Sequence, residues 1–173
     1  MSFFMGRYET PDYSVVLSED SFEIREYSEF NVVEYDNDAD PYISRGFGTL
    51  FSYISDNNKQ NQKISMTVPV IEEIRQDKMK MAFVVSKKLK DNIPEPNDSN
   101  LKIRKFDTGT FAVIKYSGFS NKEKESKMIQ RLEEWYTGKG YIRISNYMLA
   151  FFNPPITPPM FRRNEIMVRV EKQ

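Results

Sequence analysis

The feature that most constrains the fold of this chain is an internal repeat. Residues 22–27 and 31–35 alternate apolar and polar side chains, a pattern typical of half-buried β-strands. Residues 101–106 and 110–116 show the same alternation, and an Ile-Arg pair occupies the same place in the first strand of each pair. The sequence therefore predicts two copies of one structural unit, each of which opens with two neighbouring strands.

An amphipathic helix is predicted after each strand pair. Asp40 and Pro41 suit the start of the first helix, because aspartate caps free N–H groups and proline lacks the N–H that would need a partner. Ser120 and Glu123 have the spacing of a capping box at the start of the second helix. Apolar residues then recur at helical spacing: Ile43, Phe47, Leu50, Phe51 and Ile54 in the first helix, and Met128, Leu132, Trp135 and Tyr136 in the second.

Two more strands are predicted after each helix, at residues 63–70 and 79–85 and at residues 143–150 and 164–170. The chain thus consists of two ββαββ repeats, at about residues 20–86 and 101–171. One repeat alone would leave a sheet face bare, so the two repeats should share a core. We expect a single α+β domain over residues 1–173: a distorted, mainly antiparallel β-barrel with pseudo-twofold symmetry, flanked by two helices.

Composition excludes several classes of function. The chain has 173 residues with no Cys and no His, which rules out thiolate and histidine catalysis, iron–sulfur clusters and zinc sites built from these residues. Lys plus Arg and Asp plus Glu both number 25, and a chain without excess positive charge is a poor candidate for nucleic-acid binding. We expect no signal peptide and no membrane span, and we expect a cytoplasmic monomer without catalytic residues or a metal site.

Four segments carry a resemblance to a known family. They are Phe-Glu-Ile-Arg-Glu-Tyr at residues 22–27, Gly-Phe-Gly-Thr-Leu-Phe-Ser-Tyr-Ile at 46–54, Lys-Ile-Ser-Met-Thr-Val-Pro-Val at 63–70, and Asn-Pro-Pro-Ile-Thr-Pro-Pro-Met-Phe-Arg-Arg-Asn-Glu at 153–165. In order and spacing they resemble the SOUL haem-binding-protein family across nearly the whole chain. The last two segments are the most specific, because runs of that length rarely match by chance.

The resemblance implies a ligand and a place for it. It implies that haem or a related tetrapyrrole binds, without catalysis, in a groove between the first helix and the Pro-rich loop near the C-terminus. Some family members are thought to use an axial His, which this chain lacks, so here the resemblance implies hydrophobic binding without His ligation. A more distant likeness is to the ligand-sensing domains of bacterial multidrug-responsive regulators, which share the doubled ββαββ plan.

The candidate groove residues form three groups. Each group also has a plainer interpretation: the apolar wall could be ordinary core packing, the proline-rich lip a rigid connector between strands, and the cations solvated surface charge. Iron ligation is left to Met or Tyr side chains, among them Met66, Met160 and Tyr53, or to no protein group, so a bound haem should be labile. The groups are an apolar wall of Phe47, Leu50, Phe51 and Ile54, a stiff lip of Pro155, Ile156, Met160 and Phe161, and cations for the propionates at Arg45, Lys63 and Arg162.

Other functions compete with tetrapyrrole binding. The chain could bind or sense other amphipathic molecules, and a buried acid opposite a cationic ligand would then be expected; Glu165 is the candidate, unless it pairs with a neighbouring Arg. A hydrolase is a minority interpretation, because no paired-carboxylate signature is present. The Pro-rich loop could also bind a protein partner. Gly46 and Gly48 lie within the first predicted helix, where glycine is costly, so a close approach by backbone or ligand should justify them.

Overall fold

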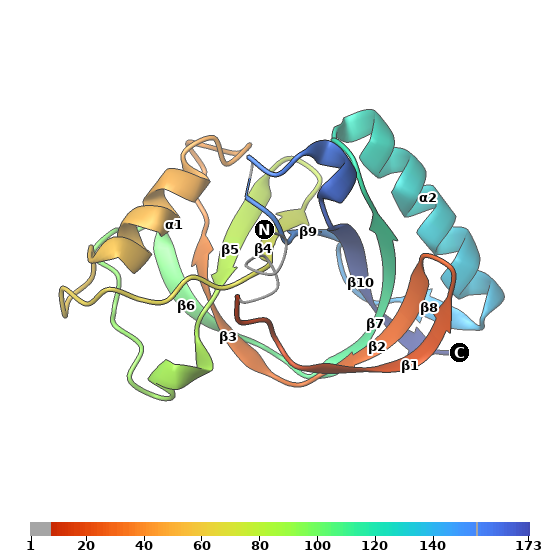
Figure 1. Cartoon of the computed structure of the whole chain (residues 1–173), viewed down its shortest axis with the longest axis horizontal. Coiled ribbons are helices and arrows are strands. Elements are labelled where there is room, and N and C mark those ends of the chain that lie inside the picture. Colours follow the sequence, from red (N-terminus) through yellow and green to blue (C-terminus); the bar gives the residue numbers. More distant parts are fainter. Residues whose placement is uncertain (1–7, 155) are drawn as a thin grey trace.

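The computed structural model describes residues 8–154 and 156–173, which fold into one strongly curved ten-stranded sheet with two α-helices on its outer face (Figure 1). The helices are α1 (Gly46–Ser55) and α2 (Lys122–Gly138), and two short 3₁₀ helices are η2 (Lys87–Leu89) and η3 (Pro159–Phe161). The strands are β1 (Tyr13–Glu19), β2 (Phe22–Tyr27), β3 (Phe30–Tyr35), β4 (Val70–Ile74), β5 (Met79–Val84), β6 (Leu101–Phe106), β7 (Gly109–Tyr116), β8 (Tyr141–Arg143), β9 (Met148–Phe151) and β10 (Asn164–Lys172).

The strand order shows the predicted doubling. The sheet runs β1-β2-β7-β10-β9-β4-β5-β3-β6, and β8 pairs with β10. Without β1 and β8 this order has two matching halves, β2-β7-β10-β9 and β4-β5-β3-β6, which meet where β9 pairs with β4. Each repeat places its first strand in the other half, because β2 pairs with β7 and β6 pairs with β3. The two repeats therefore share one sheet, and the β-rich α+β fold with pseudo-twofold symmetry is confirmed.

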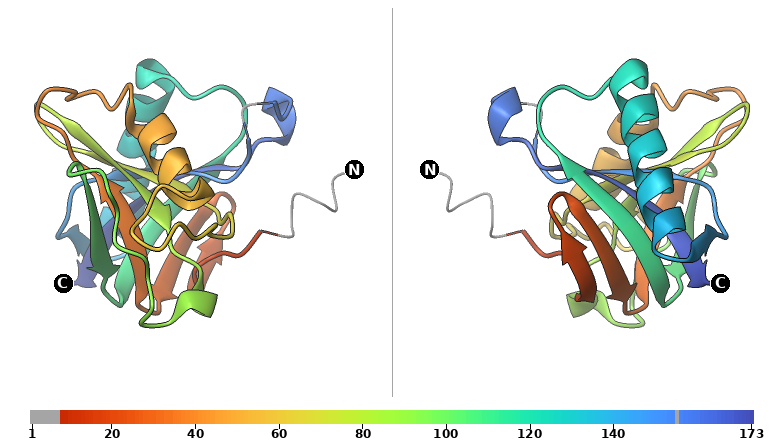
Figure 2. Two further views of the ribbon diagram at one scale, coloured as in Figure 1. Left: turned by 90° about the vertical axis from the view of Figure 1, so that its left-hand side faces the viewer. Right: turned by 90° about the vertical axis from the view of Figure 1, so that its right-hand side faces the viewer.

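The sheet does not close into a complete barrel. Strands β1 and β6 lie at its two ends and do not pair with each other. Its curvature nevertheless creates an enclosed concave face and a convex face, and period-two alternation assigns each side chain to one of them. Val32 belongs to the core cluster on the concave face, whereas Val33 belongs to the cluster beneath α1. A third cluster, which includes Leu132 and Ile166, lies beneath α2. Figure 2 shows α1 and α2 on opposite sides of the molecule.

The starts of both helices differ from the prediction. Helix α1 begins at Gly46 rather than after Asp40, and Ile43 has a φ of 55° that interrupts any earlier helix. The Asp40 carboxylate instead accepts hydrogen bonds from the N–H groups of Ser44 and Arg45, which hold the pKa of Asp40 down at about 2. A short carboxylate side chain can therefore organise a turn as readily as it caps a helix.

The predicted capping box of the second helix is also wrong. Asn121 is the N-cap residue of α2, and its side chain accepts the hydrogen bond from the N–H of Lys124. The Ser120 hydroxyl donates instead to the Glu125 carboxylate at 2.6 Å and lies 2.7 Å from the Tyr116 hydroxyl. Adjacent Ser and Asn residues are both good caps, so local sequence could not choose between them.

Two predicted strands differ from the structure. The strand predicted at residues 63–70 is wrong except for Val70, where β4 begins, and the strand predicted at residues 143–150 is interrupted, because residues 144–147 lie between β8 and β9. Strand β1 was not predicted at all. Within the described residues, no helix combines the length and the apolarity that a membrane span requires.

Candidate ligand-binding groove

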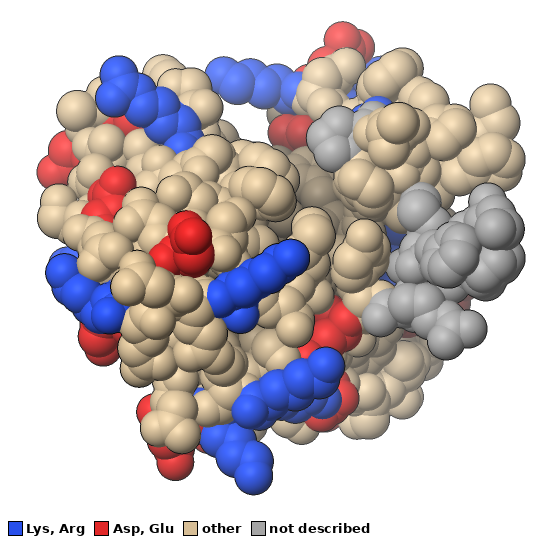
Figure 3. All heavy atoms as spheres, turned by 60° about the vertical axis from the view of Figure 1, so that its left-hand side comes forward, with Lys and Arg blue, Asp and Glu red and all other residues tan. Residues whose placement is uncertain are grey.

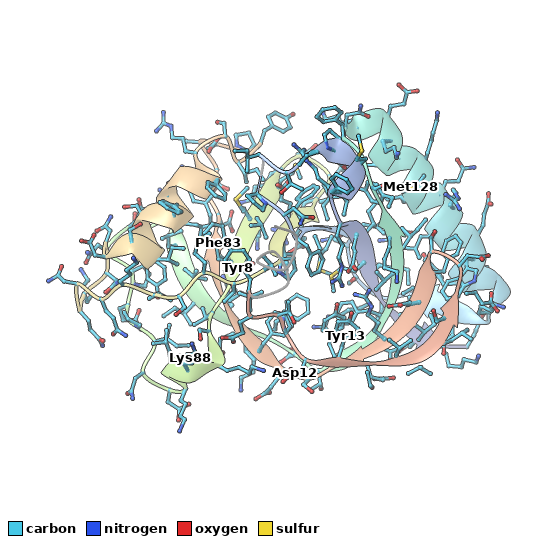
Figure 4. All side chains as sticks on the ribbon, viewed as in Figure 1. Tyr8, Asp12, Tyr13, Phe83, Lys88 and Met128 are labelled. Atoms are coloured by element: carbon cyan, nitrogen blue, oxygen red, sulfur yellow. The ribbon has the colours of Figure 1, made fainter. Side chains whose placement is uncertain are left out.

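Helix α1 presents different side chains to the sheet and to solvent. Leu50 and Ile54 are buried against the sheet, with exposed fractions of 0% and 8%, whereas Phe47 and Phe51 remain 45% and 44% exposed. The rings of Phe47 and Phe51 stack at 6.0 Å, and Phe47 also meets Phe83 of β5 edge-on at 5.5 Å. Figure 4 shows Phe83 between β5 and α1. A ligand at the helix surface would contact the two phenylalanines but not Leu50.

Beside the helix lies a small hollow of about 30 Å³. Ligand pockets for small molecules are usually about 300–1,000 Å³, so this hollow cannot enclose a tetrapyrrole. A ligand would therefore lie across the surface and use the hollow only for an edge or a substituent. Ile54 and Met66, both predicted groove residues, contribute to the lining, which also includes Phe47, Ser65, Thr67, Val70, Phe83 and Val84.

The Pro-rich loop lies apart from α1 (Figure 2). Its apolar side chains at Ile156, Met160 and Phe161 are 88%, 72% and 70% exposed. The carbonyl of Pro159 accepts a hydrogen bond from the N–H of Gly118, so η3 is anchored to the connection that leads into α2 rather than to α1. Pro155 lies outside the described residues.

The surface is hollowed between these two elements. Figure 2 shows α1 and η3 projecting from separate parts of the fold, and Figure 3 shows a deep notch between the corresponding parts of the surface. The two elements on either side of this notch carry large exposed apolar side chains. We call the space between them the groove and name its sides by these side chains: Phe47 and Phe51 of α1 with Met66 beside the helix, and Ile156, Met160 and Phe161 of the Pro-rich loop.

The predicted cations have different surroundings. Arg45, at the start of α1, and Lys63 are exposed. Arg162 donates a hydrogen bond to the carbonyl of Thr157 at 2.8 Å, and its guanidinium lies 5.3 Å from the ring centre of Phe119. Arg163 has the opposite orientation and bonds Glu165 on the concave face, so only one residue of the Arg-Arg pair can serve the groove. This agrees with the alternation expected at the start of a strand.

The fold lowers the number of side chains that could ligate iron. Tyr53 is fully buried and donates its hydroxyl hydrogen bond to the carbonyl of Pro94, so it cannot reach a ligand in the groove. Met66 and Met160 are exposed, with fractions of 49% and 72%. Residues 8–154 and 156–173 contain no group of three His, Cys, Asp or Glu side chains that could hold a metal ion.

The two glycines of α1 differ in their surroundings. A Cβ atom at Gly46 would meet Tyr35 Cδ2 at 3.2 Å and Met81 Sδ at 3.3 Å, so close packing of helix on sheet explains this glycine. A Cβ atom at Gly48 would meet nothing within 4 Å. The fold gives no packing reason for Gly48, which leaves room at the helix surface beside Phe47.

We expect Gly48→Ala to stabilise the protein by about 0.5–1 kcal/mol, because alanine is the better helix former and meets no obstacle. Gly46→Ala should give no such gain, because its methyl group must displace Tyr35 or Met81. Urea denaturation of both variants checks the pair. A loss of stability in Gly48→Ala would contradict the open surroundings of that residue.

The concave face contains a buried charge cluster that sequence reasoning did not assemble. Arg25 and Glu165, 1% and 0% exposed, form a bidentate pair with N–O distances of 2.7 and 3.0 Å. Arg163 donates a third charged hydrogen bond to Glu165, and Glu23 accepts one from Arg25. Burial alone would lower the pKa of Arg25, but the hydrogen bonds and charge of Glu165 outweigh burial and raise it.

This cluster decides the role of Glu165. Its two carboxylate oxygens are taken by two arginines, so the structural pairing considered above is confirmed and no oxygen is left for a cationic ligand. The Tyr13 ring lies 4.3 Å from the Arg25 guanidinium and covers it from the concave side, where Figure 4 labels Tyr13. The one sequence feature that pointed to this cluster was the repeated Ile-Arg pair, because neighbouring residues of a strand direct their side chains to opposite faces of the sheet and Arg25 follows Ile24.

Comparisons with known proteins give the family. The family model described as SOUL heme-binding protein matches residues 8–169. Heme-binding protein 1 of Sus scrofa is 26% identical over 178 aligned residues, which cover 93% of this chain and 92% of that protein.

Solved structures are similar in fold alone, because their sequence identities are low. The EcmrR protein in a cryo-EM structure of an EcmrR–DNA complex superposes with a TM-score of 0.66 and 14% identity, covering 88% of this chain and 57% of that one. A crystal structure of a hydrolase from Listeria innocua gives a TM-score of 0.60 and 12% identity, covering 90% and 94%. The sequence match over residues 8–169 is what assigns the family, and this chain belongs to the SOUL haem-binding protein family.

Proposed function

We propose that this protein binds haem or a related tetrapyrrole non-catalytically in the groove between α1 and the loop that carries η3. The observation that carries the proposal is the concentration of exposed apolar side chains on both sides of the groove, together with family membership. Single exposed apolar residues are normal on a protein surface, whereas contiguous ones mark binding sites.

The proposed binding mode depends on apolar contact rather than on an iron–protein bond. The chain has no His or Cys, and Tyr53 is occupied in the core. The stacked pair Phe47 and Phe51 offers an aromatic surface to one face of a flat macrocycle. Arg45 and Lys63, which are exposed near this wall in sequence, are the proposed partners for the propionates. We propose no catalytic residues.

An absorbance titration with haemin and with metal-free protoporphyrin tests this binding mode. We expect comparable affinities for the two ligands, because iron contributes little when no strong axial ligand is available. The haemin complex should be labile on gel filtration and should not show the low-spin spectrum of bis-histidine ligation. A tight low-spin complex, or clear selectivity for the iron-bearing ligand, would contradict the proposal.

The same titration locates the site when it is repeated on variants. Phe51→Ser should weaken both ligands about tenfold or more, because a buried phenylalanine contributes about 1.5–3 kcal/mol. Val16→Ser is the matched control, because Val16 is 57% exposed on the distant strand β1. Equal effects of the two substitutions would show that the ligand does not bind at α1.

A further inference from the structure

A single charged residue interrupts an apolar row that crosses the convex face from β2 to β6. Residues paired on neighbouring antiparallel strands share a face of the sheet. Glu72 of β4 pairs with Met81 of β5 on one side and with Leu149 of β9 on the other, and both neighbours are buried. The complete row of paired residues, from β2 to β6, is Phe22, Ile114, Ile166, Leu149, Glu72, Met81, Tyr35 and Leu101.

Glu72 lies where the helices leave the sheet uncovered. The principal contacts of α1 are with β3 and β5, and those of α2 are with β7, β8 and β10, so β4 and β9 run between the two helices. Val70 precedes Glu72 by two residues on the same face of β4 and lines the hollow beside Phe47 and Phe83. The apolar floor of the groove therefore continues along β4 to Glu72.

The Glu72 carboxylate has no compensating partner. Among the described residues it forms no hydrogen bond or ion pair, in contrast to Glu165, whose oxygens meet two arginines. The groups that face it are Glu125 from the first turn of α2 and the Tyr116 hydroxyl from β7. Burial, followed by the negative charge of Glu125, raises the pKa of Glu72 to about 7. A partly buried acid between apolar neighbours is costly unless a ligand meets it.

We propose that Glu72 is the recognition point at the inner end of the groove, and that the groove accepts amphipathic molecules whose apolar body carries a cationic group. This inference rests on the proposed function, because it concerns the same groove, and it adds amphipathic cations to the tetrapyrroles as a class of ligand. The ligand's cation pairs with Glu72, and its apolar body lies against Phe47 and Phe83.

The positions of charge along the groove give the ligand a direction. Glu72 lies on the sheet floor, whereas Arg45 and Lys63 are exposed. An acidic group on the ligand would be repelled by Glu72 and would remain at the outer, cationic end. A cation at the inner end would favour the ionised form of Glu72, so binding strengthens as pH rises through the titration range of this carboxyl.

Two ions of nearly identical shape and opposite charge test the inference: tetraphenylphosphonium and tetraphenylborate. Calorimetric titration of the full chain at pH 8.5 should show the phosphonium binding about tenfold more tightly than at pH 5.5, where Glu72 is protonated. Glu72→Gln should weaken the phosphonium by about the same factor and remove the pH dependence. The borate should bind no more weakly to Glu72→Gln than to the unmodified protein.

Glu73→Gln is the matched control. Glu73 is the next residue of β4, points to the opposite face and accepts a hydrogen bond from Asn146 at 2.8 Å. It should leave phosphonium binding unchanged. Equal phosphonium affinity in the unmodified protein and in Glu72→Gln overturns the inference. Tighter binding of the borate to the unmodified protein than to Glu72→Gln also overturns it.

The haemin titration separates this failure from failure of the proposed function. Haemin binding that depends on Phe51, together with phosphonium binding that ignores Glu72, would retain the tetrapyrrole site and reject Glu72 as its recognition point. Absence of binding for haemin and for both tetraphenyl ions would reject both proposals. Circular dichroism of each variant establishes that a lost signal does not reflect unfolding.

Discussion

Replacing Glu165 with glutamine is expected to lower the free energy of unfolding by about 3–5 kcal/mol, because the buried Arg25 loses its bidentate partner and keeps, among the described residues, only Glu23 as a carboxylate partner. Arg25 is 1% exposed and directs two N–H groups at the Glu165 carboxylate, and Arg163 directs a third. Glutamine keeps the shape of the side chain but removes the negative charge. Urea denaturation at neutral pH measures the effect.

Glu171→Gln is the control for this substitution, because Glu171 lies on the same strand, β10, but is exposed. It should change stability by less than about 0.5 kcal/mol. Since the cost arises from a buried positive charge that has lost its bidentate partner, adding Arg25→Met to Glu165→Gln should recover part of the loss. If Glu165→Gln is as stable as the unmodified protein, the cluster on the concave face is not the electrostatic centre described above.

The second large effect is expected at Glu72, where substitution should stabilise. Between about pH 4.5 and pH 7 the folded protein holds a proton on Glu72 that the unfolded chain has released, since burial raises the pKa from 4.5 to about 7. Stability conferred by this group therefore falls as pH rises through that window. At pH 8, Glu72→Gln should be more stable than the unmodified protein by about 2–3 kcal/mol, and at pH 4 the two should be nearly equal.

Denaturation curves at pH 4, 6 and 8 measure this difference. Glu73→Gln, on the opposite face of β4, should show no comparable pH-dependent gain. A gain for Glu72→Gln that is the same at all three pH values would mean that the carboxyl titrates normally. It would also argue against Glu72 as the group that binds the cation of a ligand.

Much of the fold could be predicted from periodicity. The alternation in residues 22–27 and 110–116 identified strands because side chains on a sheet alternate between two faces, both buried here. The repeat identified the doubled unit. The helix starts could not be predicted as well, because Asp40 and Ser120 make side-chain hydrogen bonds that serve a turn or a neighbouring glutamate equally well.

The candidate site was only partly predictable. Phe47 and Phe51 were assigned together with Leu50 and Ile54, since all four share an apolar helical stripe; only packing on the sheet separates the exposed pair from the buried pair. Glu72 was not singled out, because nothing in its local sequence distinguishes it from Glu73. The division of the chain at residues 20–86 and 101–171 stays a prediction, as do the roles proposed for Arg45, Lys63 and Met66.

The sequence by itself determined which segments alternate, how often the unit repeats, and which chemistries are absent, because these properties depend on neighbouring residues and on composition. Only the tertiary structure decided which charges meet. Arg25 and Glu165 are separated by 140 positions yet share two hydrogen bonds, whereas Glu72 lies within an apolar row and has no hydrogen-bond or ion-pair partner among the described residues. Strand register sets both outcomes, because it chooses the neighbours of every side chain across the sheet.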